Sequence, residues 1–416
     1  MCLLARIDVS REDCGMTRSQ RIEFDNLRGQ TLAGRLELPP SEPRAFAIFA
    51  HCFTCGKDIA AATRISRALA AKGFGVLRFD FTGLGNSGGD FANQNFSSNI
   101  DDLVAAAQWL AENHQAPRLL VGHSLGGAAV LIAGNRIESV AAITSIGAPS
   151  HPDHVQHLLE GSLETIRETG SATVSLAGRA FTIQSQFLDD LQEQEVAGTL
   201  RKLHKAVLIL HSPQDEIVNV DHARKLYMSL QHPKSFVSLD GADHLLTKRA
   251  DSQYAAEVIA AWAGRYLPPF DHPDTESGVV RVSGRADGFV QLCTAGGHDW
   301  LADEPKSVGG SGLGPTPYDL LLAALGTCTS MTLGMYARHK KLPLESVSVA
   351  LQHDRIHAKD CEDCDKTDGQ VDRIQRVLTV VGDLDDAQRA RLVEIADRCP
   401  VHRTIANEIK IETRWS

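Results

Sequence analysis

The sequence predicts an α/β protein with a doubly wound, mostly parallel sheet in its first two-thirds and a smaller α+β domain in its last third. From about 20 to 266, short apolar runs alternate with amphipathic stretches, a pattern typical of parallel strands covered by helices on both faces. The proline-rich stretch 267–278 breaks this pattern and is expected to be a linker. Over 279–416 the expected order changes to two strands, a Gly-rich loop, a long helix, a strand, an acidic loop, a strand, a helix and a short strand.

Individual elements follow from the length and period of each run. The stretch 31–38 alternates apolar and polar residues, which predicts an antiparallel edge strand. Residues 150–196 interrupt the alternation and are expected to form a small cap, with a hairpin around 174–183. Near-continuous apolar runs predict six further strands, at 46–50, 75–79, 118–121, 140–143, 207–210 and 235–239.

Composition limits the partners and the compartment. A formal net charge of −10 gives no electrostatic footprint for nucleic acid or an anionic membrane surface. We find no run of 18 apolar residues and no secretory signal, and Met16 is an alternative start. Nine irregularly spaced cysteines argue against a secreted disulfide framework. We therefore expect a cytoplasmic protein with reactive or metal-binding thiols.

A nucleophile motif lies between a predicted strand and a predicted helix. Gly122-x-Ser124-x-Gly126 directly follows the apolar run 118–121 and precedes a helical stretch. A serine on such a sharp turn needs small neighbours, and the turn lifts its hydroxyl above the sheet. The helix behind it favours developing negative charge. In this context the motif predicts a catalytic serine.

An acid and a histidine follow the serine in the order that this chemistry requires. Asp215 and His244 each come shortly after a predicted strand. His244 would take the proton of Ser124, and Asp215 would orient the imidazole and stabilise its charged form. Glu216 and Asp243 lie nearby and are the alternative acids.

The loop after the strand 46–50 is expected to complete an oxyanion hole. We assign its two donors to the backbone N–H groups of Leu125 and Phe53. With the segments 51–58 and 80–87, these motifs resemble the α/β-hydrolase superfamily, in particular its small esterase, lipase and serine-aminopeptidase-like branch, over about 20–266. That family usually has glycine after the loop histidine, where this chain has Cys52.

Cys52 and Cys55 form a C-x-x-C pair beside the predicted site. That spacing suits thiol–disulfide exchange. The alternative is two small buried residues under a tight loop.

Two cysteines of the last third fall on apolar faces of predicted helices. Cys328 shares a 4-3-4-3 stripe with Leu321, Leu325, Thr332 and Met335. A second helix, about 386–398, places Leu392, Ala396 and Cys399 on one face before Pro400 ends it. These faces could bring the two thiols together.

The motifs Gly314–Cys328 and Cys399-Pro-Val-His402 resemble the OsmC/Ohr family of osmotically induced and organic-hydroperoxide-resistance proteins, over about 280–416. The whole chain resembles bacterial α/β-hydrolase/OsmC fusion proteins. The resemblance implies an intertwined homodimer and a thiol peroxidase, with Cys328 peroxidatic, Cys399 resolving and Arg285 assisting the thiolate. The family often has glutamate ten residues before the first cysteine. This chain has Tyr318 there, with Asp319 adjacent as a substitute.

A second cluster contains the ligand types that zinc prefers. His353 and His357 would share one face of a strand, and Cys361 and Cys364 follow closely. The spacing matches no common zinc module, so we assign no metal and no cofactor.

The sequence thus predicts a hydrolase of small esters, or less favourably amides, acting through an acyl-Ser124 intermediate. Its expected partners are a small-molecule ester, an organic hydroperoxide, a thiol reductant and a second copy of the chain. Two alternatives stay open. The OsmC-like part is only a dimerisation module, or the protein is a redox protein with a vestigial hydrolase domain.

Overall fold

The computed structural model describes residues 18–39, 42–52, 55–176, 179–193, 196–267, 278–284, 286, 288–357 and 370–415. The chain divides into two compact units, Met1–Ala286 with Thr294–Asp299 and Asp287–Cys293 with Trp300–Ser416. Of the predicted linker 267–278, all but its first residue and its last lie outside the described residues.

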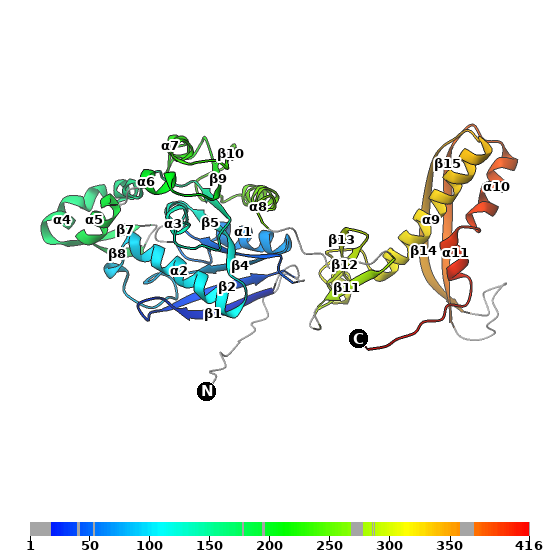
Figure 1. The fold of residues 1–416 in the computed structure, drawn as a ribbon, viewed down its shortest axis with the longest axis horizontal. Coiled ribbons are helices and arrows are strands. Elements are labelled where there is room, and N and C mark those ends of the chain that lie inside the picture. Colours follow the sequence, from blue (N-terminus) through cyan, green and yellow to red (C-terminus); the bar gives the residue numbers. More distant parts are fainter. Residues whose placement is uncertain are drawn as a thin grey trace. The chain divides into compact units, whose positions relative to one another are not determined.

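An eight-stranded sheet is the centre of the first unit (Figure 1), in the order β1-β2-β4-β3-β5-β6-β9-β10. β3, β4, β5, β6, β9 and β10 pair in parallel, while β1 and β2 are antiparallel. Its strands are β1 (Arg18–Asp25), β2 (Thr31–Leu38), β3 (Ala45–Ala50), β4 (Phe74–Phe79), β5 (Pro117–His123), β6 (Ala142–Ile146), β9 (Ala206–His211) and β10 (Lys234–Ser238).

The sequence prediction needs one correction at the edge of this sheet. The 31–38 strand is antiparallel as expected, but it is not the edge, because β1 pairs with it on the outer side. β1 carries mostly polar residues, and its two partly or fully buried apolar positions, Ile22 and Phe24, are too few to give a clear alternating pattern.

Helices cover both faces of the sheet, and each face has its own core. One core packs α2 (Phe96–Asn113) and α3 (Leu125–Ala133) on the sheet, and Phe96, Leu103 and Leu131 are fully buried there. The other core packs α1 (Ala60–Ala71) and α8 (Arg249–Ala263) on the opposite face, with Ile65 and Leu69 at its centre. α7 (Asp221–Ser229) packs beside α6 and β9. Strand residues buried from both sides explain the near-continuous apolar runs.

The cap segment has the hairpin that the sequence predicted. β7 (Ser171–Leu176) and β8 (Arg179–Gln184) pair antiparallel. The side chain and backbone N–H of Ser97 in α2 both donate to Asp190 of the cap. Short helices complete it and join the first core, namely η2 (Pro152–Ser162), α4 (Leu163–Thr169), α5 (Ser185–Glu193) and α6 (Val196–Arg201). A further turn, η1 (Phe91–Asn93), contacts β8.

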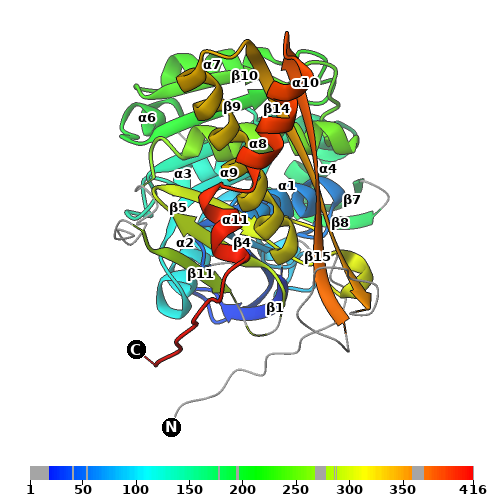
Figure 2. The same ribbon diagram turned by 90° about the vertical axis from the view of Figure 1, so that its right-hand side faces the viewer.

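The second unit is built on a long two-stranded ribbon of β14 (Leu344–His357) and β15 (Gln370–Gly382). The helices α9 (Pro317–Lys340) and α10 (Asp386–Ala396) run along it, as Figures 1 and 2 both show. The core between them is small, formed by Leu333, Leu384, Leu392, Ile395 and Ala396. A three-stranded sheet precedes α9, one strand more than expected, and consists of β11 (Val280–Gly284), β12 (Gln291–Ala295) and β13 (His298–Ala302). The turn η3 (Lys306–Val308) follows it. α10 is followed by a short helix, α11 (Pro400–Ile405), and the final short strand that the sequence predicted does not form in the described residues 406–415.

Helix α9 is long and apolar enough, by length and composition alone, to cross a membrane. Core helices of globular proteins pass the same test. Thr316 begins the helix with a capping box, in which its hydroxyl accepts from the Asp319 N–H while the Asp319 carboxylate accepts from Thr316.

Candidate active site

Ser124 occupies the sharp turn between β5 and α3. Its φ of 56° and ψ of −124° lie in a backbone region that few residues other than glycine adopt. The Ser124 N–H donates to the carbonyl of Ile146 at the end of β6, at 2.8 Å. The turn is therefore fixed to the neighbouring strand.

The two glycines of the motif are required by close backbone packing. A Cβ at Gly126 would lie 2.3 Å from the carbonyl oxygen of His51, and one at Gly122 would lie 2.3 Å from the carbonyl oxygen of Gly126. Neither backbone can move aside, because both belong to the turn or to the loop after β3. The sequence pattern thus reflects a three-way contact between β5, α3 and that loop.

The predicted serine, histidine and acid form one hydrogen-bonded chain. His244 Nε2 lies 3.0 Å from Ser124 Oγ, and His244 Nδ1 lies 2.7 Å from Asp215 Oδ2. The side chains of His244 and Asp215 are 7% and 2% exposed. A proton on Nδ1 leaves Nε2 free to accept from the serine hydroxyl, which is the arrangement that activates a serine.

Asp215 is held by more than the histidine. Its other oxygen, Oδ1, accepts from the backbone N–H groups of Ile217 at 2.9 Å and Val218 at 2.8 Å. Burial alone would raise the pKa of Asp215, but the hydrogen bond from His244 and those from the two amides outweigh it and lower the pKa below its ordinary value. The carboxylate is therefore ionised at neutral pH.

The alternative acids do not take this place. Asp243 accepts hydrogen bonds from the backbone N–H and the hydroxyl of Thr247, four residues further on. Glu216 is exposed beside Asp215. The structure brings only Asp215, of the three acids considered, to His244.

Two residues that lie against His244 were not identified as part of the site from the sequence. His123 Nε2 lies 2.7 Å from the carbonyl oxygen of His244, so this nitrogen carries the hydrogen and donates. Burial, followed by the proximity of His244, lowers the pKa of His123 to about 4, which keeps its ring neutral. Gly147, with φ +54°, passes so close that an added Cβ would lie 3.4 Å from His244 Nδ1. The only sequence signal was a histidine inside the serine motif.

The loop after β3, which begins at His51, is hydrogen-bonded at both of its ends to Asp80 and Phe81, the residues that follow β4. The Asp80 carboxylate accepts from the backbone N–H of Lys57 at 2.7 Å and pairs with its ammonium at 2.6 Å. His51 Nε2 accepts weakly from the Phe81 N–H, at 3.4 Å. Between these anchors, Cys52 and Cys55 are joined by a disulfide. The bonded pair replaces the interpretation of two small buried residues.

One of the two expected oxyanion donors can be placed. Leu125 is the first residue of α3, where the backbone N–H groups have no partner within the helix. Phe53 lies outside the described residues. A small hollow of about 10 Å³ beside Leu125 and Gly126 is also lined by Cys52 and Phe81.

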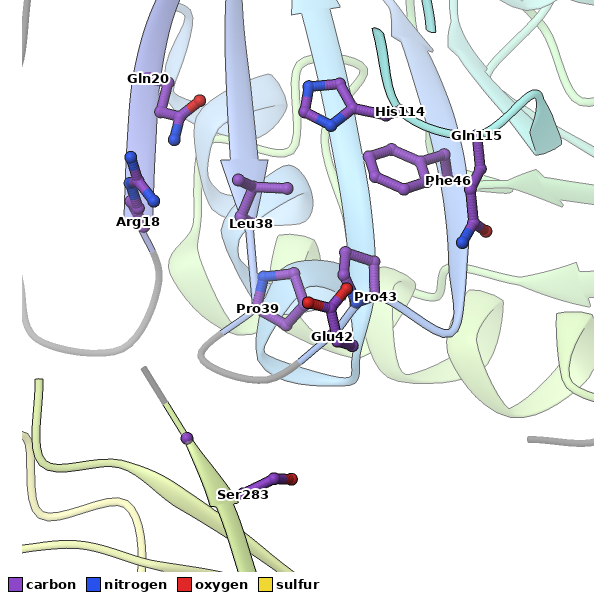
Figure 3. Close-up of a pocket in the computed structure, with 11 residues that line it drawn as sticks. Arg18, Gln20, Leu38, Pro39, Glu42, Pro43, Phe46, His114, Gln115 and Ser283 are labelled. Atoms are coloured by element: carbon purple, nitrogen blue, oxygen red, sulfur yellow. The ribbon is translucent and has the colours of Figure 1, made fainter. Parts of the chain in front are cut away.

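A larger hollow lies at the other end of the sheet and holds none of the three predicted catalytic residues. Figure 3 shows Leu38, Phe46 and His114 among the residues that line it. Phe46 is near the start of β3, whereas His51 follows the end of that strand. The rings of Phe46 and His114 stack with their centres 5.2 Å apart. This hollow is therefore separate from the Ser124 site.

In the second unit the two predicted cysteines are free thiols. Cys399 is fully buried, and its Sγ lies 3.6 Å from the hydroxyl of Thr329, the neighbour of Cys328 in the chain. Cys328 itself is partly exposed. Of the predicted stripe, Leu325 is buried in the single chain, whereas Cys328 and Thr332 are partly exposed and Leu321 and Met335 are exposed. The other buried residues of α9 are Gly326, Thr329, Leu333 and Ala337, so Thr329 and not Cys328 lies on the buried face.

The placement of Cys399 on a helix end also needs correction. α10 ends at Ala396, and Cys399 is the N-cap residue of α11, with its sulfur accepting from the His402 N–H at 3.3 Å. Pro400 is the first residue of α11, a position where its missing N–H costs nothing. Pro400 therefore starts a helix instead of ending one.

Arg376 of β15 is a further residue that the sequence did not single out. Its guanidinium donates to the Thr329 hydroxyl and to the Ala396 carbonyl, both at 3.1 Å, and pairs with Asp397. It thus links the helix that carries Cys328 to the turn that carries Cys399. Arg285, the predicted arginine, lies outside the described residues.

The residues that the sequence suggested as a substitute acid or as metal ligands have other contacts. The Asp319 carboxylate caps α9, and Tyr318 stacks on His353 with ring centres 4.3 Å apart. His353 also bonds to Asp372 at 3.0 Å. Among the described residues no group of three or more His, Cys, Asp or Glu could hold a metal ion. The side chain of His357, with Cys361 and Cys364, lies outside the part that is described.

Comparison with known proteins agrees with this architecture. Residues 41–193 match the family described as serine aminopeptidase, S33, and residues 309–414 match the OsmC-like protein family. The esterase domain of a Rhodothermus marinus protein is 47% identical over 60% of this chain and all of that chain, with a TM-score of 0.52. No curated protein sequence matches this chain.

More distant structures share the fold alone. Est1E from Butyrivibrio proteoclasticus is 18% identical over 59% of this chain and 98% of its own, with a TM-score of 0.50. A hypothetical protein of Pseudomonas aeruginosa is 18% identical over 64% of this chain and all of its own, with a TM-score of 0.53.

The first two-thirds of the chain is thus an α/β-hydrolase domain. An OsmC-like domain follows it. The chain belongs to the family of α/β-hydrolase/OsmC fusion proteins.

Proposed function

We propose that the first domain is a serine hydrolase that cleaves small carboxylic esters through an acyl-Ser124 intermediate. The observation that carries the proposal is the unbroken chain from Ser124 Oγ through His244 to Asp215, with links of 3.0 and 2.7 Å. The 47% identity to a domain described as an esterase favours esters over amides. The small cap favours a substrate of modest size.

The reaction follows from the roles of these groups. His244 Nε2 takes the hydroxyl proton as Ser124 Oγ attacks the ester carbonyl, and Asp215 stabilises the imidazolium that forms. The amides of Leu125 and Phe53 would bind the oxyanion. The imidazolium then protonates the leaving alcohol. Water repeats the sequence on the acyl-enzyme and releases the acid.

The test is Ser124→Ala assayed with a panel of short-chain 4-nitrophenyl esters and a fluorophosphonate probe. We expect kcat to fall on the order of 10⁴-fold or more, and probe labelling to disappear. Ser150→Ala is the matched control, because Ser150 Oγ also bonds to a histidine, His222, at 3.0 Å. Near-normal turnover in Ser124→Ala, or an equal loss in Ser150→Ala, would contradict the assignment.

A second activity is proposed for the OsmC-like domain, namely reduction of organic hydroperoxides. This proposal is supported by the position of the Cys399 sulfur, which lies beside Thr329, and Thr329 directly follows Cys328 in the chain. The Cys328 thiolate would attack the hydroperoxide, giving a sulfenic acid and an alcohol. The Cys399 thiol would then form a disulfide and release water, and an external thiol reductant would restore both thiols.

The same domain is proposed to join two copies of the chain. Apolar side chains on the outer faces of α9 and β15 are largely exposed in the single chain, among them Met331 at 68%, Met335 at 63% and Val377 at 62%. Exposed apolar patches of this kind mark association surfaces. A particle mass near twice that of one chain in sedimentation equilibrium would support a homodimer, and a monomer at micromolar concentration would exclude it.

A further inference from the structure

The disulfide between Cys52 and Cys55 lies where the proposed hydrolase chemistry takes place. It forms within the loop that connects β3 to α1, directly after His51. Cys52 is 4% exposed and lines the small hollow beside Leu125 and Gly126, whereas Cys55 is partly exposed to solvent. One sulfur-bearing residue therefore faces the nucleophile turn, and the other is accessible from outside.

This disulfide contributes little as a structural staple. The stabilisation from a cross-link grows with the length of the loop that it closes, and these cysteines are only three residues apart. Moreover, the loop is already anchored by the Lys57–Asp80 pair, by the hydrogen bond between the Cys55 N–H and the Cys52 carbonyl at 3.2 Å, and by His51. A two-residue gap between cysteines is instead the spacing of thiol–disulfide exchange sites.

The loop is packed directly against the serine turn. The position that a Cβ would take on Gly126 lies 2.3 Å from the His51 carbonyl oxygen and 2.6 Å from that of Ala50. Cys52 follows His51, and the His51 ring holds the carbonyl of Cys52 through Nδ1 at 2.8 Å. A change in the Cys52 side chain therefore reaches the backbone that supports Ser124 and Leu125 across two contacts.

We propose that Cys52–Cys55 is a thiol–disulfide exchange site through which a dithiol reductant lowers the activity of the hydrolase domain. The regulatory part of this proposal rests on the proposed ester hydrolysis, while the exchange itself does not. The substrate class of the site is a dithiol in the reducing direction and a disulfide in the oxidising direction.

The exchange balances as follows. A thiolate of the dithiol attacks the sulfur of Cys55, the partly exposed residue of the pair, and the Cys52–Cys55 bond breaks. Cys52 leaves as a thiolate and takes a proton from water. The second thiol of the reductant loses its proton to water and, as a thiolate, attacks the reductant's sulfur in the mixed disulfide. Cys55 leaves as a thiolate and takes a proton from water, so two electrons and two protons pass to the protein and the reductant leaves as a disulfide. A disulfide oxidant reverses these steps.

Reduction is expected to lower kcat because it frees Cys52 to change its side-chain position at the serine turn. Loss of one oxyanion-hole donor costs on the order of 10²–10³-fold in kcat. A loop that is loosened but still anchored by Lys57 and His51 would lose less than this, and we expect a fall of about tenfold.

The experiment uses the full chain and two readouts. The protein is incubated with dithiothreitol or with oxidised dithiothreitol, and free thiols are alkylated and located by mass spectrometry. Turnover of a 4-nitrophenyl ester is measured on the same samples. We expect Cys52 and Cys55 to be blocked in the oxidised sample and alkylated in the reduced one, with kcat falling about tenfold and recovering on reoxidation.

Variants assign the effect to this pair. The double variant Cys52→Ser/Cys55→Ser should have the low kcat of the reduced protein and no response to dithiothreitol, while Cys293→Ser, which changes a buried thiol of β12, should keep the full response. Alkylation of both cysteines in the oxidised protein would overturn the exchange site. A dithiothreitol response that persists in the double variant, or an unchanged kcat in the reduced wild type, would overturn the control of activity. Absence of ester turnover in both states would refute the proposed function alone, because the alkylation pattern is read independently.

Discussion

Replacing Asp215 by asparagine tests the proposed triad through a single atom. Oδ1 of Asp215 accepts from two backbone N–H groups, those of Ile217 and Val218, and only Oδ2 faces His244. In Asp215→Asn the amide oxygen must stay on those two donors, because an NH₂ group in that place would point its hydrogens at the N–H hydrogens of Ile217 and Val218. The NH₂ group is therefore forced to face His244 Nδ1.

The consequence is the wrong tautomer of the histidine. Nδ1 must now accept, so the ring proton moves to Nε2, which can no longer take the proton of Ser124 3.0 Å away. The same change in a serine triad costs about 10⁴-fold in kcat. At about 1.36 kcal/mol for each factor of ten, this is about 5.4 kcal/mol of lost transition-state stabilisation.

The assay is steady-state ester hydrolysis with circular dichroism as the check on folding. Both backbone hydrogen bonds survive in Asp215→Asn, so the melting temperature should change little. Asp243→Asn is the control, since that carboxylate bonds to its near neighbours in the chain, Leu245 and Thr247, and its kcat should stay within about threefold. A loss of less than about tenfold in Asp215→Asn, or an equal loss in Asp243→Asn, would refute the reasoning.

Two further predictions concern the thiols and the histidines. In Cys399→Ser, about one equivalent of an organic hydroperoxide should leave a sulfenic acid on Cys328, detected by mass spectrometry as a dimedone adduct. The wild-type protein should instead form a disulfide between Cys328 and Cys399. If the wild type forms no such disulfide and the variant shows no dimedone adduct, the domain is not a peroxidase. Burial, aided by His154 and Lys225, lowers the pKa of His222 to about 4 from 6.5, and its Nδ1 accepts from the Ser150 N–H at 3.1 Å. Because the unfolded chain takes up this proton first, the free energy of unfolding should fall as the pH drops from about 6.5 toward 4. His222→Asn keeps an acceptor without titrating, so urea denaturation at several pH values should show a shallower fall; an unchanged slope would exclude His222 as a source.

The parallel sheet was predictable because burial on both faces leaves a strong signal. Runs such as 46–50 and 207–210 are apolar at nearly every position, and the structure places strands at Ala45–Ala50 and Ala206–His211. β1 gave no such signal, since only Phe24 is fully buried among its eight residues. Apart from Ile22 and Phe24 the residues of β1 are polar, so its alternating pattern is too short to detect.

The candidate triad could be selected from the sequence because chain order and strand ends restrict the choice to a few acids. The contacts that support the triad could not be predicted from the sequence. Nothing in the sequence indicates that His123 donates to the carbonyl of His244, or that Arg376 reaches Thr329, because both contacts join segments distant along the chain.

The error at Cys399 has a different origin. Helical periodicity continues smoothly through 386–399, but the chain leaves the helix at Asp397 and begins another at Pro400. Proline is compatible with both the end of one helix and the first turn of the next. Periodicity alone does not distinguish the two cases.

At position 124 the residue that would give the most stable fold differs from the residue that the reaction needs. A left-handed conformation costs an L-residue on the order of 1–2 kcal/mol, a cost that glycine does not bear. Selection for stability alone would therefore favour glycine at 124, which has no hydroxyl. The serine persists only where the reaction is under selection, so its retention among relatives of this chain, together with Gly122 and Gly126, would report whether their hydrolase domains still work.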